Sequence, residues 1–143
     1  MPRMIFVNLP VRDLDRSIAF YRSVGARKDP RFCDASACMM SLSDTIHIML
    51  LTHARFGDFT PKALADPRTG AQVLLAITAD SRDDVDATVA RAVAAGAAPD
   101  PSPIDDYDFM YGRSFEDLDG HVWGINWMDV EAATAAHSAP AGA

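Results

Sequence analysis

The stretch IFVNLPVRDLDRSIAFYRSVG (residues 5–25) contains the pattern on which the fold prediction depends. Residues 5–11 have the composition of a largely buried strand, and Asp13 follows as a side chain suited to cap a helix. The apolar stripe of that helix recurs at helical spacing at Leu14, Ile18 and Tyr21. Gly25 is typical of a helix end. The stretch therefore predicts a strand, a capped helix and a glycine stop.

The same order of features returns about 71 residues later. Residues 73–79 again predict a strand, Ser81 and Asp84 resemble a capping box, and Gly96 ends the helix. The apolar stripe of this second helix is Val85, Val89 and Val93. Extended segments are expected after each helix, at 26–33, 36–42 and 45–52 in the first half and at 97–99, 109–116 and 121–128 in the second. Each half is therefore predicted to be a βαβββ module.

The repeat predicts an α+β fold within one domain, residues 1–130. Module one covers 4–52, a linker that holds a short helical turn or acts as a flap covers 53–70, and module two covers 71–128. An Ala-rich tail, a short helix followed by a frayed end, occupies 131–143. Neither module can bury both faces of its own sheet, so we expect a curled eight-stranded mixed sheet, with helices on one surface and a concave trough on the other.

The composition narrows the possible partners. Of 143 residues, 49% are hydrophobic and 23% charged, and the net charge of -7 carries no basic patch, which argues against nucleic acid as a partner. No window approaches a membrane span and no signal peptide is evident, so we expect a cytoplasmic protein that does not bind membranes. Cys33 and Cys38 are expected to be two reduced core residues. A small organic molecule and a second copy of the chain, in a homodimer, are the expected partners.

Two motifs lie near the ends of the repeat. The first comprises FVNLPVRD (6–13), LDRS (14–17) and FY (20–21), and the second is SFEDLDGHVW (114–123), with Leu118 where a proline usually stands. Both resemble the vicinal oxygen chelate superfamily, which contains glyoxalases, bleomycin resistance proteins and extradiol dioxygenases. The resemblance covers residues 4–128 and implies the glyoxalase/bleomycin resistance fold.

Metal-using members of that superfamily bind one divalent ion through four inward-facing positions. Carried over to this sequence, these positions are Phe6, Met49, Leu74 and Gly124. Their phenyl, thioether, isobutyl and hydrogen substituents are poor ligands for a hard or borderline metal. The resemblance therefore implies vacated metal positions, and no cofactor is predicted. The alternative is a divalent metal held by His47, His121, Gln72 or an aspartate in non-standard positions.

Polar side chains remain on the predicted trough face. These are Asn8, His47, Thr78 and Asn126, and together with Met49, Tyr111 and Arg113 they are the candidate ligand-binding residues. His47 has three open interpretations: a hydrogen-bonded residue of the sheet, a substrate contact or a general base. His121 is interpreted as a turn residue. No serine or cysteine has a sequence context that marks a nucleophile, and catalytic residues stay unassigned.

Tyr107, Phe109, Tyr111 and Arg113 alternate along one expected strand. They are either a stacking wall for an anionic or aromatic ligand, or a sheet face packed on a helix or a dimer partner. The sequence as a whole favours a protein that binds a small organic molecule in the trough without a metal. The alternatives are a metal-dependent lyase or dioxygenase with non-standard ligands, and a structural or regulatory dimer with a filled trough.

Overall fold

The computed structural model describes residues 1–138 and divides into two compact units. Unit 1 comprises residues 1–71 together with 118–121, and unit 2 comprises residues 72–117 and the chain from 122 onward. Each unit combines helices with one mixed sheet, which confirms the α+β class. No helix in the described part of the chain is long and apolar enough to cross a membrane.

Unit 1 is a four-stranded sheet with one long helix against it. Its elements are β1 (Ile5–Val11), α1 (Leu14–Ser23), β2 (Arg27–Cys33), β3 (Ala37–Ser41), β4 (Ile46–Thr52) and the short α2 (His53–Gly57). The strand order is β1-β4-β3-β2, with β1 and β4 parallel and the other pairs antiparallel. This is the predicted order of module one, and α2 is the helical turn expected in the linker.

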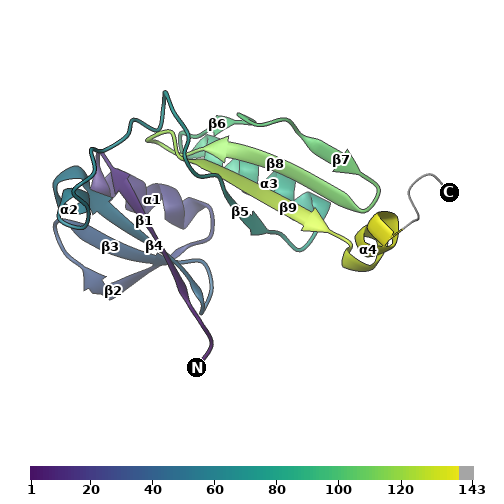
Figure 1. Cartoon of the computed structure of the whole chain (residues 1–143), viewed down its shortest axis with the longest axis horizontal. Coiled ribbons are helices and arrows are strands. Elements are labelled where there is room, and N and C mark those ends of the chain that lie inside the picture. Colours follow the sequence, from purple (N-terminus) through teal and green to yellow (C-terminus); the bar gives the residue numbers. More distant parts are fainter. Residues whose placement is uncertain (139–143) are drawn as a thin grey trace. The chain divides into compact units, whose positions relative to one another are not determined.

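Helix α1 packs on one face of this sheet (Figure 1). The side chains between helix and sheet are almost fully buried, and they include Phe20, Tyr21, Met40, Ile48 and Leu50. Because strand side chains alternate, the neighbours of these strand residues must lie on the opposite face. That opposite face of the unit 1 sheet is therefore the one available to a ligand.

Unit 2 repeats the arrangement with more strands. Its elements are β5 (Leu75–Thr78), α3 (Arg82–Ala94), β6 (Ala98–Pro99), β7 (Asp105–Tyr107), β8 (Met110–Glu116), β9 (Val122–Met128) and α4 (Val130–Ser138). The sheet has the order β5-β9-β8-β6, with β7 paired to β8, and β5 runs parallel to β9. Helix α3 covers one face of this sheet (Figure 1). Between helix and sheet, Val85 and Val89 pack on Ile125.

Both long helices begin and end as the sequence repeat predicts. Asp13 accepts a hydrogen bond from the Arg16 amide, and Ser81 accepts one from the Asp84 amide. Each helix closes with a positive-φ glycine, Gly25 or Gly96, followed by a hydrogen bond from the next amide back to the last turn. These bonds satisfy carbonyls that a helix end leaves unpaired.

The second module departs from the prediction in its strands. Over residues 1–138 the structure has nine strands in a four-stranded and a five-stranded sheet, where eight in one curled sheet were expected. The additional strand is β7, because residues 108–109 form a turn inside the run that was expected to be one strand. Tyr107 and Phe109 therefore do not continue the alternation of Tyr111 and Arg113. Residues 131–138 belong to α4, and the predicted frayed tail at 139–143 lies outside the described residues.

The turn at residues 118–121 belongs to unit 1 and is held there by hydrogen bonds. The Arg12 amide donates to Oδ1 of Asp119 at 2.8 Å, and Nε2 of His121 donates to the Pro10 carbonyl at 2.8 Å. The Arg68 guanidinium donates to the Leu118 carbonyl at 2.6 Å. His121 thus has the structural role in the turn that the sequence indicated.

Replacing Gly120 with alanine should destabilise the protein. Gly120 has φ +101°, and a Cβ built there would lie 3.1 Å from the Arg68 amide nitrogen. Strained backbone of this kind costs on the order of 1–3 kcal/mol, and urea unfolding should show that loss. Gly57→Ala is the control, because nothing lies within 4 Å of its Cβ position. Equal unfolding midpoints for the two variants would contradict this account.

Candidate functional site

The open face of the unit 1 sheet carries two cross-strand rows of side chains. In the first row, Phe6 pairs with His47, His47 with Ser41, and Ser41 with Arg27. The second row is Asn8, Met49, Met39 and Asp29. Directly opposed residues on one face lie roughly 4.5–5.5 Å apart between Cβ atoms. Register alone therefore brings residues from four strands into one patch.

These rows form the floor of a cavity of about 450 Å³ in unit 1, which we call the unit 1 cavity. Its lining residues are Met4, Phe6, Arg27, Asp29, Arg31, Phe32, Met39, Ser41, Ser43, Asp44, His47 and Met49. Of the predicted candidates it includes His47 and Met49, as well as the vacated metal position Phe6. Asn8 lies on the same face but is exposed and does not line the cavity.

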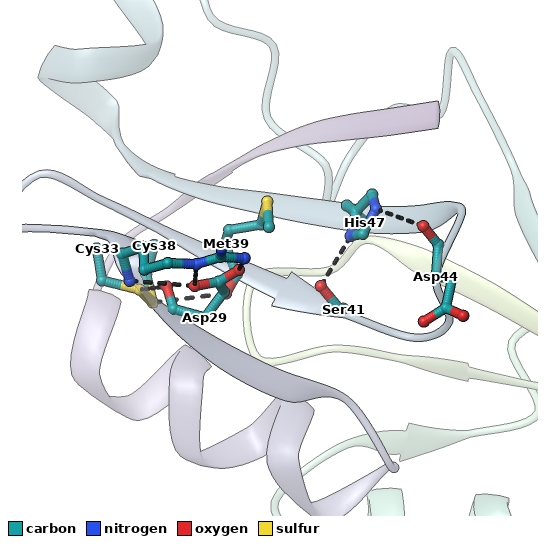
Figure 2. A network of polar contacts seen from close by, with 8 residues as sticks. Asp29, Cys33, Cys38, Met39, Ser41, Asp44 and His47 are labelled. Carbon is teal, nitrogen blue, oxygen red and sulfur yellow. Dashed lines mark hydrogen bonds and ion pairs between the residues drawn. A yellow bond between two sulfur atoms is a disulfide. The ribbon is translucent and has the colours of Figure 1, made fainter. Parts of the chain in front are cut away.

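His47 has the most defined polar environment in the unit 1 cavity. Its side chain is 7% exposed, and the Phe6 ring stacks against it with 5.0 Å between centroids. Nε2 lies 3.2 Å from the Asp44 carbonyl, and Nδ1 lies 2.7 Å from the Ser41 hydroxyl (Figure 2). A carbonyl can only accept, so Nε2 carries the proton of the neutral ring. Nδ1 is then the acceptor, and the Ser41 hydroxyl donates to it.

Ser41 is the site residue that sequence reasoning did not find. Its neighbours in sequence, Met40 and Leu42, give no signal for a nucleophile. The pair exists because β3 and β4 are antiparallel and place Ser41 opposite His47. A possible sequence signal is their spacing of six residues across the Ser43–Asp44 turn, which brings the two positions together if the hairpin register is assumed.

The charged groups of the unit 1 cavity balance one another. The Arg31 guanidinium donates to both carboxylate oxygens of Asp29, at 3.0 and 2.7 Å, and these bonds lower the pKa of Asp29. Within residues 1–138, no ion pair is formed by Arg27 or Asp44. The lining therefore carries two arginines and two aspartates, although the whole chain is acidic.

The two cysteines correct one expectation. Cys33 and Cys38 are joined by a disulfide, where two reduced core residues were expected (Figure 2). They are directly opposed on the antiparallel strands β2 and β3, which brings their Cα atoms to 4.0 Å. Their separation in sequence concealed this, because the pairing depends on a register break between Asp29 and Cys33.

Two further candidate residues, Thr78 and Asn126, lie on the face of the unit 2 sheet that α3 does not cover. Thr78 pairs with Asn126, and Asn126 with Gly112. A Cβ at Gly112 would collide with Oδ1 of Asn126, so the glycine makes room for this amide. Asn126, Leu74 and Gly124 line a cavity of about 160 Å³, which is smaller than the unit 1 cavity.

Tyr111 and Arg113 lie on the other face of the unit 2 sheet, against α3. The Tyr111 hydroxyl donates to Asp86 at 2.6 Å, and the Arg113 guanidinium donates to Asp86 at 3.0 Å and to Asp100 at 2.7 Å. Of the two interpretations, a stacking wall for a ligand or a sheet face packed on a helix, these contacts favour the packed sheet face. Arg113 also lines the cavity of about 160 Å³ in unit 2, and a ligand contact by Tyr111 or Arg113 stays a prediction.

The four positions inferred for a metal do not fit one. Phe6 and Met49 contribute a phenyl ring and a thioether to the unit 1 cavity, while Leu74 and Gly124 offer no donor atom. Over the part of the chain that the structure describes, no group of three or more His, Cys, Asp and Glu side chains could hold an ion. Divalent metals of this fold require nitrogen or oxygen ligands. No chemical step is therefore assigned to a metal.

Comparison with known proteins decides the family. The model of the glyoxalase/bleomycin resistance protein/dioxygenase superfamily matches residues 3–125, most of the chain. The chain belongs to this superfamily. None of the proteins with curated functions matches it.

Solved structures from several bacteria have the superfamily fold in common with this chain. Hypothetical protein SA1046 from S. aureus is 22% identical, with a TM-score of 0.73 over 89% of this chain and 94% of its own. A superfamily enzyme from Burkholderia phytofirmans is 23% identical, with a TM-score of 0.71 over 89% and 99%. The fosfomycin resistance protein FosX from Mesorhizobium loti is 18% identical, with a TM-score of 0.63 over 94% and 96%. At these identities the likeness concerns the fold alone.

Arg113→Met should lower the stability of this superfamily member and flatten its pH dependence. Hydrogen bonds from Arg113 lower the pKa of Asp100, and those from Tyr111 and Arg113 lower the pKa of Asp86. A carboxyl group whose pKa is lower in the folded than in the unfolded state stabilises the fold at pH values above its unfolded-state pKa of about 3.9. This stabilisation is lost as the pH falls through the folded-state pKa. Melting temperatures of both proteins should therefore converge between about pH 5 and pH 2.

The matched control is Arg55→Met, whose exposed ion pair with Asp58 should contribute little. At pH 7 we expect Arg113→Met to cost about 1–2 kcal/mol, because its side chain is only 21% exposed. If the Arg113→Met curve stayed parallel to the wild-type curve at all pH values, the ion pairs would not cause the pH dependence.

Divalent metals should leave the thermal stability of this superfamily member unchanged. Because a ligand stabilises the folded state according to its affinity, we expect added Mn²⁺, Ni²⁺ or Zn²⁺ to shift the melting temperature by less than about 1 °C. Differential scanning fluorimetry with and without a chelator makes the measurement. A stoichiometric ion found by elemental analysis of the purified protein would contradict the conclusion that these four positions do not fit a metal.

Proposed function

We infer that the protein binds a small, uncharged, mainly apolar organic molecule in the unit 1 cavity without a metal. The observation that carries this proposal is the replacement of donor atoms by apolar groups on a hollowed sheet face. Phe6 and Met49 both line the cavity at positions where metal-using members of the superfamily are expected to hold ligands. Met4, Met39 and Phe32 extend the same apolar lining.

The lining suits planar or irregular organic molecules. Methionine side chains adapt to irregular shapes because they have several rotatable bonds and a polarisable sulfur. The Phe6 ring, held flat against His47, offers its outer face for stacking. Each methylene group that a ligand buries here contributes about 0.8 kcal/mol. A cavity of this size lies within the range of small-molecule sites.

The charges of the cavity favour a neutral ligand. Arg31 and Asp29 neutralise each other, and the other two charged lining residues are one cation, Arg27, and one anion, Asp44. The net formal charge of these four groups is zero, in contrast to the net charge of -7 for the whole chain. The acidity of the protein therefore does not by itself make this cavity a site for cations.

The neutral fluorescent probe N-phenyl-1-naphthylamine tests the proposal. We expect saturable binding of one probe per chain to the wild type. Met49→Glu should weaken it at least about tenfold, because the probe would have to desolvate a carboxylate at the floor of the cavity. A fluorescence titration measures both affinities.

Met128→Glu is the matched control, since Met128 is an exposed methionine in unit 2, outside the cavity. Its affinity for the probe should equal that of the wild type. Equal weakening by both substitutions, or the absence of saturable binding to the wild type, would overturn the proposed site. Melting temperatures of the variants establish that each is folded.

A further inference from the structure

We propose that Ser41 is a nucleophile, activated by His47, that attacks carboxylic esters bound in the unit 1 cavity. This inference rests on the proposed function, because the same cavity must admit the ester. It adds an acyl-transfer activity that uses neither a metal nor a cofactor. The observation behind it is the hydrogen-bonded series of the Ser41 hydroxyl, the His47 ring and the Asp44 carbonyl (Figure 2).

The geometry meets the requirements for an activated hydroxyl. Oγ of Ser41 lies 2.7 Å from Nδ1 of His47, within the range for direct proton transfer. The Asp44 carbonyl fixes the proton on Nε2, so Nδ1 presents its lone pair to the serine. Burial of His47 under Phe6 holds the ring in this orientation. A nucleophile, a base and a third group that orients the base are therefore all present.

The serine is also accessible from the cavity. Ser41 is half-buried and lines the cavity, so a ligand on the apolar floor would lie beside its hydroxyl. Met39 precedes it by two residues on the same face of β3, and Met49 lies opposite Met39 on β4. These two methionines would contact the apolar part of an ester whose carbonyl is at Ser41. The favoured substrate class is an ester with an aliphatic or aromatic acyl group.

Each step of the reaction balances. Oγ forms a bond to the carbonyl carbon of the ester, and the hydroxyl proton moves to Nδ1 of His47. The bond from that carbon to the alkoxy oxygen then breaks, and His47 returns the proton to the departing alcohol. Water attacks the acyl-serine in the same manner and regenerates Ser41. The sum is ester plus water giving acid plus alcohol.

Arg27 is placed to stabilise the oxyanion that forms when Oγ attacks. It is the direct partner of Ser41 across the β2–β3 pair and lines the same cavity. It forms no ion pair within the described residues, so its guanidinium is available to the negative charge that develops. A cation at that position stabilises the transition state more than the ground state, because the negative charge develops only as Oγ attacks.

The test uses the full chain and p-nitrophenyl butyrate. Wild-type protein should release p-nitrophenol, and intact-mass spectrometry should detect a butyryl adduct that peptide mapping assigns to Ser41. Ser41→Ala should abolish the adduct, and His47→Gln should slow its formation about 100-fold or more, because the amide can accept the hydrogen bond but cannot take the proton. Ser23→Ala is the control, since Ser23 is exposed on α1.

Binding of N-phenyl-1-naphthylamine separates this inference from the proposed function. We expect the wild type and Ser23→Ala to bind the probe with equal affinity and to be acylated at equal rates, because Ser23 lies outside the unit 1 cavity. Wild-type protein that binds the probe but forms no adduct at Ser41, or hydrolysis that persists in Ser41→Ala, would overturn the nucleophile and leave the binding function intact. Acylation of Ser41 without probe binding would support the nucleophile and count against the proposed ligand class.

Discussion

The register of the parallel pair β1–β4 is the constraint on which the candidate site depends. It sets Phe6 beside His47, and the antiparallel β3 then sets Ser41 on the other side of that histidine. The register is fixed by the opposite face, where Ile48 and Leu50 are completely buried beneath α1. A slip of one residue would expose this apolar set to water and send the cavity side chains into the core. The core of unit 1 therefore enforces the geometry of its open face.

The polarity of the unit 1 cavity follows from the side chains that occupy its two cross-strand rows. Phe6 lies on β1, Met49 on β4 and Met39 on β3, while Arg27, Asp29 and Arg31 lie on β2, at the edge of the sheet. The disulfide joins β2 to β3 beyond the register break and holds the end of that edge strand to its neighbour. An apolar floor with a neutralised charged rim favours molecules that transfer readily from water and carry no net charge.

In unit 2, the charged side chains of the same kind of module stabilise the contact between helix and sheet. Its sheet carries Arg113 between Asp86 and Asp100, with Tyr111 sharing Asp86, and these groups tie β8 to α3 and to the segment after β6. In unit 1 the charged side chains Arg27, Asp29 and Arg31 line the cavity on the open face instead. Two modules with one chain order thus differ in which side of the sheet holds their charged groups.

The sequence by itself determined the modules, because helix caps, glycine stops and apolar periodicity are local signals. Asp13, Ser81, Gly25 and Gly96 act as their residue types predicted, and the two terminal motifs identified the superfamily. Only the tertiary structure decided the pairings between strands: Ser41 with His47, Cys33 with Cys38, and the turn that separates Tyr107 from Tyr111. These pairings depend on register, and register is set by the packing of whole faces, which no single stretch of sequence contains.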